Sequence, residues 1–199
     1  MTVFFDIDTQ IDFLFPAGAL YVPGAETILD RVAALNRLAA SRGIPVISTM
    51  DAHAEDDPEF RVYPHHCVAG TDGQRKPAAT LVENRVVVPN APSDRSAAQI
   101  LLEKQQLDCF TNVNLPSILD RLKANRYFVY GVVTEICVKC AAFGLLKRGG
   151  RVTLVSDAVR ALNDDAASRM IAEFCASGGE LMTAAEVREL VDGEDQVCR

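Results

Sequence analysis

The chain has 199 residues, with 20 basic and 27 acidic side chains and a net charge of −7; its isoelectric point is near 5.0. This length suits a single α/β domain, and hydrophobic residues make up 49% of it, enough for a sizeable core. The composition excludes disorder, collagen and coiled coil. The acidic balance argues against a nucleic acid partner, because phosphate binding rewards clustered Lys and Arg.

No segment of the sequence has the pattern of a membrane span or a signal peptide. Charged residues interrupt every apolar stretch well before the roughly 20 residues that a bilayer span requires. The opening Met-Thr-Val-Phe-Phe-Asp also lacks the basic region of a signal peptide. We therefore expect a cytoplasmic protein with no membrane partner. Its cysteines, at 67, 109, 137, 140, 175 and 198, should be mostly free thiols.

The first half of the chain alternates apolar strands with helical spacing. Residues 2–8 are rich in branched and aromatic side chains, which is typical of a buried parallel strand. The polar segment 51–84 predicts a long excursion over the carboxyl edge of a sheet. The predicted elements are, in order, strand 2–8, helix 25–42, strand 46–50, the excursion 51–84, and short apolar runs at 85–88 and 99–103.

The second half continues the same alternation and shows no linker or repeat. Strands that alternate with helices predict an α/β fold with a mostly parallel sheet and helices on both faces. The ligand site of such a fold lies outside the carboxyl ends of the strands. We expect a single domain over 1–191. Its elements are helix 115–122, strand 127–133, helix 136–147, strand 151–156, helix 166–176, strand 180–183 and helix 184–191, before a polar tail at 192–199.

Three side chains at this predicted edge could form a nucleophilic set. Cys137 begins a helix directly after a strand, where the helix dipole favours a thiolate and free N–H groups can hold an oxyanion. Asp8 ends the first strand, and Lys104 closes an apolar run. A carboxylate could accept the thiol proton, and an ammonium would bias both pKa values. Inert roles, such as a buried core Cys, a capping Asp and a solvated Lys, remain the alternatives.

All three histidines of the chain fall inside the excursion 51–84. Asp51 and His53 directly follow the second strand, and His66 lies further along. Carboxylate and imidazole together suit Zn²⁺, Mn²⁺ or Fe²⁺, with positions left for water or substrate. The alternative is that these side chains cap the loop by hydrogen bonds.

Two other patterns suggest different chemistry. Cys137 and Cys140 form a Cys-x-x-Cys, which can be a redox pair or half of a zinc site. The opening FFDIDTQ resembles the first motif of haloacid-dehalogenase-type phosphatases, with Asp6 as nucleophile and Asp8 as acid. That interpretation would make Asp164 and Asp165 the Mg²⁺ ligands. However, those phosphatases place the later acidic pair after an apolar strand, and this pair has none before it.

Several motifs together resemble those of the isochorismatase-like cysteine hydrolases, in that family's order and over nearly the whole chain. The sequence is most similar to the nicotinamidases of that family, because isochorismatases typically lack the candidate metal ligands. The matching segments are 8–13 (DTQIDF), 18–25 (GALYVPGA), 51–53 (DAH), 63–71 (YPHHCVAGT), Lys104 and 131–138 (GVVTEICV).

The resemblance implies a three-layer fold with a roughly six-stranded sheet, and it assigns roles to residues. Asp8, Lys104 and Cys137 would be a catalytic triad, in which Cys137 forms a thioester and Asp8 transfers the proton. Backbone N–H groups of Val133 and Cys137 would form the oxyanion hole beside a cis peptide bond at 132–133. Asp51, His53 and His66 would bind a divalent metal, with zinc as the first candidate and manganese or iron as alternatives.

The resemblance also implies a substrate. A nicotinamidase converts nicotinamide and water to nicotinic acid and ammonia, within NAD salvage and pyridine nucleotide metabolism. Another small amide or ureide is the alternative. Phe13 and Tyr63 would bind the substrate ring, with Tyr63 standing where a stacking Trp is common; Ala52 and Glu135 depart from the usual Trp and Asp. The family often forms dimers or tetramers, so a homo-oligomer is expected.

Overall fold

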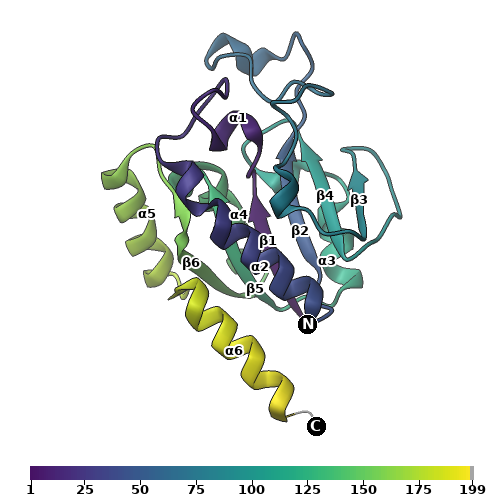
Figure 1. The fold of residues 1–199 in the computed structure, drawn as a ribbon, viewed down its shortest axis with the longest axis vertical. Coiled ribbons are helices and arrows are strands. Elements are labelled where there is room, and N and C mark those ends of the chain that lie inside the picture. Colours follow the sequence, from purple (N-terminus) through teal and green to yellow (C-terminus); the bar gives the residue numbers. More distant parts are fainter. Residues whose placement is uncertain (198–199) are drawn as a thin grey trace.

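The computed structural model describes residues 1–197, which form a three-layer α/β fold (Figure 1). Every strand pair in the sheet is parallel, and the strand order is β3-β4-β2-β1-β5-β6-β7. The predicted α/β class is confirmed, but the sheet has seven strands instead of about six, since short segments at both edges join it. The strands are β1 (Thr2–Ile7), β2 (Val46–Asp51), β3 (Arg85–Val88), β4 (Gln99–Lys104), β5 (Arg126–Val132), β6 (Arg151–Arg160) and β7 (Glu180–Met182).

Helices cover both faces of the sheet, and side chains of β1 show why. Successive residues of a strand point to opposite faces, so Phe5 and Phe4 belong to two separate core clusters. The Phe5 cluster includes buried side chains of α3, α4 and α5, and the Phe4 cluster those of α1, α2 and α6. The helices are α1 (Ile11–Leu14), α2 (Leu29–Ser41), α3 (Leu115–Arg121), α4 (Lys139–Lys147), α5 (Asp164–Ala176) and α6 (Ala184–Val197).

Several predicted boundaries are wrong for identifiable reasons. Helix α6 continues to Val197, through residues predicted as a tail, because a polar composition alone does not end a helix and Glu and Gln are good helix formers. Strand β6 continues to Arg160 past polar residues, since it resumes pairing with β5 after an irregularity. The predicted helix 25–42 begins with a separate 3₁₀ turn, Ala25–Ile28.

The described cysteines are free thiols, as the sequence predicts. They are Cys67, Cys109, Cys137, Cys140 and Cys175; Cys198 lies outside the described residues. Among residues 1–197, no helix combines the length and the apolar character needed to cross a bilayer.

Candidate active site

Four adjacent strands bring the predicted residues to one edge of the sheet. Asp51 and Lys104 are the last residues of β2 and β4 and are register partners. Asp8 directly follows β1, and Cys137 lies five residues beyond the end of β5. All four are buried. Because these strands are parallel neighbours, their carboxyl ends place the four side chains together.

Lys104 lies at the centre of this group. Its Nζ is 2.9 Å from Asp8 Oδ2 and 2.5 Å from Asp51 Oδ1, and it donates a 3.8 Å hydrogen bond to Cys137 Sγ. Burial alone would lower the pKa of Lys104, but the two carboxylates outweigh it and hold that pKa well above its usual value. Lys104 is therefore a permanent cation that links two acids and a thiol.

Asp8 has the surroundings of a proton acceptor. Its backbone is in the left-handed region, with φ of 48°, a conformation that Asp tolerates better than most residues. Its Oδ1 accepts a 2.7 Å hydrogen bond from Thr49 Oγ1, whereas Oδ2 has no aligned hydrogen-bond donor among the described residues. Burial raises the pKa of Asp8 despite the opposing effect of Lys104. The carboxylate is thus more basic than usual and has a free lone pair.

Cys137 lies in a π-helical turn, Thr134–Val138, between β5 and α4. The peptide bond between Val132 and Val133 is cis, at the position that the resemblance predicts. Burial raises the pKa of the Cys137 thiol well above its usual value, although Lys104 acts in the opposite direction. The sequence predicted that the helix start would favour a thiolate, but burial dominates. The resting thiol keeps its proton and needs a base.

Asp51, His53 and His66 have the arrangement of metal ligands. One ligand atom from each lies within 4.8 Å of the others. Nδ1 of His53 is 3.0 Å from Asp57 Oδ2, and Nδ1 of His66 is 2.8 Å from the Pro64 carbonyl oxygen. Acceptors at both Nδ1 atoms hold a proton there, so Nε2 is the nitrogen that each ring offers to a metal once any proton on it is displaced, as in metal-bound histidines.

A buried atom without a hydrogen bond supports the same interpretation. Nε2 of His53 is buried and has no hydrogen-bond partner among the described residues. Such an atom costs about 1–3 kcal/mol if nothing binds it. Carboxylate and imidazole donors suit a divalent transition metal, so the residues present fit one.

The sequence missed two acids beside this cluster. Asp57 contacts His53, and Glu59 Oε1 lies 3.8 Å from His66 Nε2. Burial lowers the pKa of His53, but the carboxylates of Asp51 and Asp57 outweigh it and raise the pKa to about 9. An acid four residues after His53 was the available signal, because a turn closed by the hydrogen bond from the Asp57 N–H to the Ala54 carbonyl oxygen brings Asp57 back to it.

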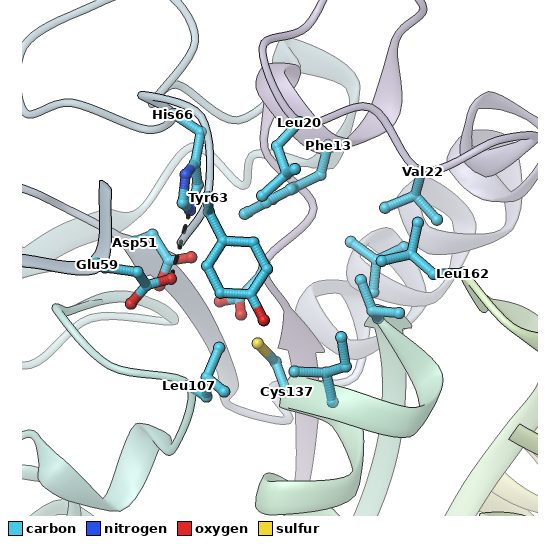
Figure 2. A pocket seen from close by; sticks show the side chains of 14 residues that line it. Phe13, Leu20, Val22, Asp51, Glu59, Tyr63, His66, Leu107, Cys137 and Leu162 are labelled. Carbon is cyan, nitrogen blue, oxygen red and sulfur yellow. Dashed lines mark ion pairs between the residues drawn. The ribbon is translucent and has the colours of Figure 1, made fainter. Parts of the chain in front are cut away.

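These groups form one wall of a pocket that encloses about 470 Å³, including its open mouth. Figure 2 shows Asp51, Glu59 and His66 on one side and Val22 and Leu162 on the other. Both predicted ring-binding residues, Phe13 and Tyr63, line it, as do Asp8, Val133 and Cys137. The remaining lining side chains are aliphatic: Leu20, Val22, Leu107, Val132, Ile136 and Leu162.

The other two sequence patterns share Asp8 and Cys137 with this pocket, but their remaining members do not line it. Asp6 is fully buried, and its carboxylate accepts hydrogen bonds from Thr9, Asn36, Ser48 and Lys76. Asp164 and Asp165 are exposed in the first turn of α5. Cys140 lies in α4 with a free thiol. The structure therefore separates the proposed phosphatase acids instead of bringing them together.

The three-layer fold places a buried nucleophile, an acid and a cation at the carboxyl edge of a parallel sheet, where enzymes of the α/β class have their active sites. The isochorismatase domain model matches residues 2–186. The chain therefore belongs to the isochorismatase family, whose relatives identify it as an amide-hydrolysing enzyme. This assignment excludes the phosphatase alternative.

Relatives with known names and structures agree with the family. The nicotinamidase of Schizosaccharomyces pombe is 28% identical, over 84% of this chain and 86% of its own length. The pyrazinamidase of Pyrococcus horikoshii, solved in complex with zinc, superposes with a TM-score of 0.80 at 27% identity, over 92% of this chain and 98% of its own. PnC1 from L. infantum, solved in complex with nicotinate, superposes with a TM-score of 0.76 at 26% identity, over 92% of this chain and 93% of its own.

Proposed function

We propose that this chain is a metal-assisted cysteine amidohydrolase and that nicotinamide is its first candidate substrate. The products would be nicotinic acid and ammonia. One observation supports the proposal most directly: Lys104 joins Asp8, beside the Cys137 thiol, to Asp51, a member of the candidate metal cluster. The named relatives support the same reaction class.

The proposed chemistry begins with a proton transfer. Asp8 takes the thiol proton, and Cys137 Sγ attacks the carboxamide carbon. Backbone N–H groups of Val133 and Cys137 bind the oxyanion. Asp8 then protonates the departing ammonia, which leaves a thioester on Cys137, and water hydrolyses this thioester to the acid. Lys104 remains charged throughout and holds both carboxylates in place.

Asp51, His53 and His66 would hold the metal, with Glu59 as an additional oxygen donor. Zinc is the first candidate, and manganese and iron accept the same ligands. When bound, the ion supplies a Lewis acid that can orient a ring nitrogen and withdraw electron density. Asp57 and the Pro64 carbonyl keep the two imidazoles oriented toward it.

The charge of the pocket favours a neutral substrate. None of the described residues that line it is Lys or Arg, whereas Asp8, Asp51 and Glu59 are acidic. A carboxylate on the substrate would therefore meet no basic side chain at the surface of the pocket. Phe13 and Tyr63 offer aromatic surface to a ring. This supports a planar uncharged carboxamide over a carboxylate-bearing amide or ureide.

The proposal is tested by ammonia release from nicotinamide. The purified enzyme is assayed with and without a chelator, beside the Cys137→Ala variant. Release that requires both the thiol and the metal is the expected result. If metal binds stoichiometrically but no ammonia appears, nicotinamide is the wrong substrate, and a panel of small amides identifies the right one.

Metal removal should also lower stability. A ligand at about 1,000 times its Kd adds roughly 4 kcal/mol to the free energy of unfolding. For a chain of this size, zinc should therefore raise the Tm of the chelated protein by about 8–16 °C. His66→Ala should lose most of this shift. His65→Ala is the matched control, since the exposed His65 stacks on Phe60 and is not in the cluster; an equal loss in both variants contradicts the metal site.

Glu135 should affect substrate binding more than turnover. Its Oε1 accepts hydrogen bonds from the backbone N–H groups of Leu162 (3.0 Å) and Asn163 (2.7 Å), and Leu162 lines the pocket. Glu135→Ala removes two hydrogen bonds to a charged acceptor, so the segment that carries Leu162 is no longer fixed at the pocket. We therefore expect the variant to raise KM by about 3–10-fold, with a smaller effect on kcat.

Steady-state kinetics with nicotinamide measure this split. Glu173→Ala is the control, because Glu173 is an acid on α5 whose side chain, among the residues the structure describes, pairs only with Lys139 at the surface. A Glu135→Ala variant whose KM equals that of the control would show that the wall does not depend on Glu135.

Other features stay predictions. Nicotinamide deamidation would place the enzyme in NAD salvage and pyridine nucleotide metabolism. A cytoplasmic location and a homo-oligomeric state are expected from the sequence and the resemblance alone.

A further inference from the structure

The proposed mechanism leaves one buried carboxylate near the pocket without a role. Asp12 lies in α1 and is 9% exposed. Its Oδ2 accepts a 2.7 Å hydrogen bond from the backbone N–H of Cys67, which is 55 residues away in sequence. Its Oδ1 accepts a 2.9 Å hydrogen bond from the backbone N–H of Ala19. Asp12 thus joins two separate segments.

The Cys67 end of this connection lies between both candidate histidine ligands. Cys67 directly follows His66, and its backbone adopts the left-handed conformation with φ of 46°. Its carbonyl oxygen accepts a 3.1 Å hydrogen bond from the backbone N–H of His53, and Ala69 returns a 2.9 Å bond to the His53 carbonyl. Whatever holds Cys67 therefore also sets the distance between His53 and His66.

The packing around Asp12 is adapted to this contact. The backbone N–H of Asp12 donates a 3.0 Å hydrogen bond to the Gly73 carbonyl oxygen, and a Cβ at Gly73 would collide with the Asp12 carboxylate. The loop after His66 thus lies directly against α1. Phe13, the next residue, packs against the His66 ring with 5.5 Å between centroids.

We propose that Asp12 is a positioning residue for the metal cluster, and that it holds His53 and His66 in binding geometry through the backbone of Cys67. The proposal rests on the metal site of the proposed function. Groups that orient metal ligands typically contribute about 10–100-fold to metal affinity. A carboxylate suits this task because each oxygen accepts one amide proton, whereas an asparagine has a single acceptor oxygen.

The test is a zinc titration of the metal-free Asp12→Asn protein against a chromogenic chelator. We expect the Kd for zinc to rise by about 10–100-fold. The matched control is Asp72→Asn, which removes one carboxylate charge from the loop that Asp12 contacts; Asp72 is exposed, and within residues 1–197 its side chain pairs only with Arg75. If the zinc Kd of Asp12→Asn equals that of Asp72→Asn, the proposal is overturned. A purely structural role of Asp12 predicts this unchanged Kd together with a lower Tm of the Asp12→Asn protein.

Two further measurements test the proposal if the Asp12→Asn variant does not fold. Asp12→Glu keeps the charge but displaces both acceptor atoms, so it should also weaken zinc binding. In the metal-free wild-type protein, the Cys67 amide should be protected from hydrogen exchange; an unprotected amide overturns the proposal.

The wild-type chain distinguishes this proposal from the proposed function. If it binds zinc but leaves nicotinamide intact, the substrate is wrong and the role of Asp12 stands. If it binds no zinc, both fail.

Discussion

Cys137→Ala should reduce amide hydrolysis by at least about 10⁴-fold, because removal of a nucleophile leaves only binding and oxyanion contacts. The thiol is buried beside Lys104, and no other described cysteine lines the pocket. The fold should survive, since alanine removes only the sulfur atom from a side chain at the pocket surface. Ammonia release under saturating substrate measures the effect, and circular dichroism checks the fold.

The matched control for this variant is Cys140→Ala. Cys140 is three residues further along the chain, with a half-buried free thiol in α4. Its loss should leave turnover nearly unchanged. Substantial activity in Cys137→Ala would overturn the cysteine mechanism, and equal losses in both variants would indicate damage to the helix instead of loss of the nucleophile.

Lys104→Met should abolish activity and strongly destabilise the protein. The substitution leaves two buried carboxylates, Asp8 and Asp51, without their cation, and breaking a buried ion pair in this way costs about 3–5 kcal/mol. Chemical denaturation of the metal-free protein at pH 7 measures the change in the free energy of unfolding.

The pH dependence of this variant has a definite sign. Burial already raises the pKa of Asp8 in the folded protein, and removal of Lys104 raises it further. A carboxyl whose pKa is higher when folded destabilises the protein above its unfolded pKa, and this cost disappears as pH falls and the group is protonated. The difference in stability between Lys104→Met and wild type should therefore shrink between about pH 7 and pH 4.

Lys76→Met separates the loss of a buried cation from the loss of catalysis. Lys76 is also buried and pairs with Asp6 at 3.3 Å, but it does not line the pocket. The Lys76→Met substitution should lower the free energy of unfolding about as much as Lys104→Met does, while the molecules that remain folded keep their activity. If the folded Lys104→Met protein is active, Lys104 stabilises the fold but is not needed for catalysis.

Much of the fold follows from the sequence because buried parallel strands are recognisable locally. The apolar runs at 2–8 and 127–133 are typical of buried parallel strands, and the corresponding strands β1 and β5 are adjacent at the middle of the sheet. The polar residues that end these runs had to meet at the carboxyl edge. This placed Asp8 and Cys137 in one site, and Asp51 with them.

Other features have no local signal. The extension of β6 to Arg160 depends on pairing with β5. Glu59 approaches His66 only because the loop folds back on itself. Hydrogen bonds and ion pairs that join distant segments cannot be read from the order of residues.

The sequence by itself determined the chemical groups of the site and the edge of the sheet on which they lie, because strand periodicity and strand ends are local properties. Only the tertiary structure decided their ionisation and orientation. Burial raises the pKa of the Cys137 thiol, Lys104 links two acids at once, and Asp12 holds a loop 55 residues away. These effects arise from desolvation and from contacts between distant segments, which exist only once the chain is packed.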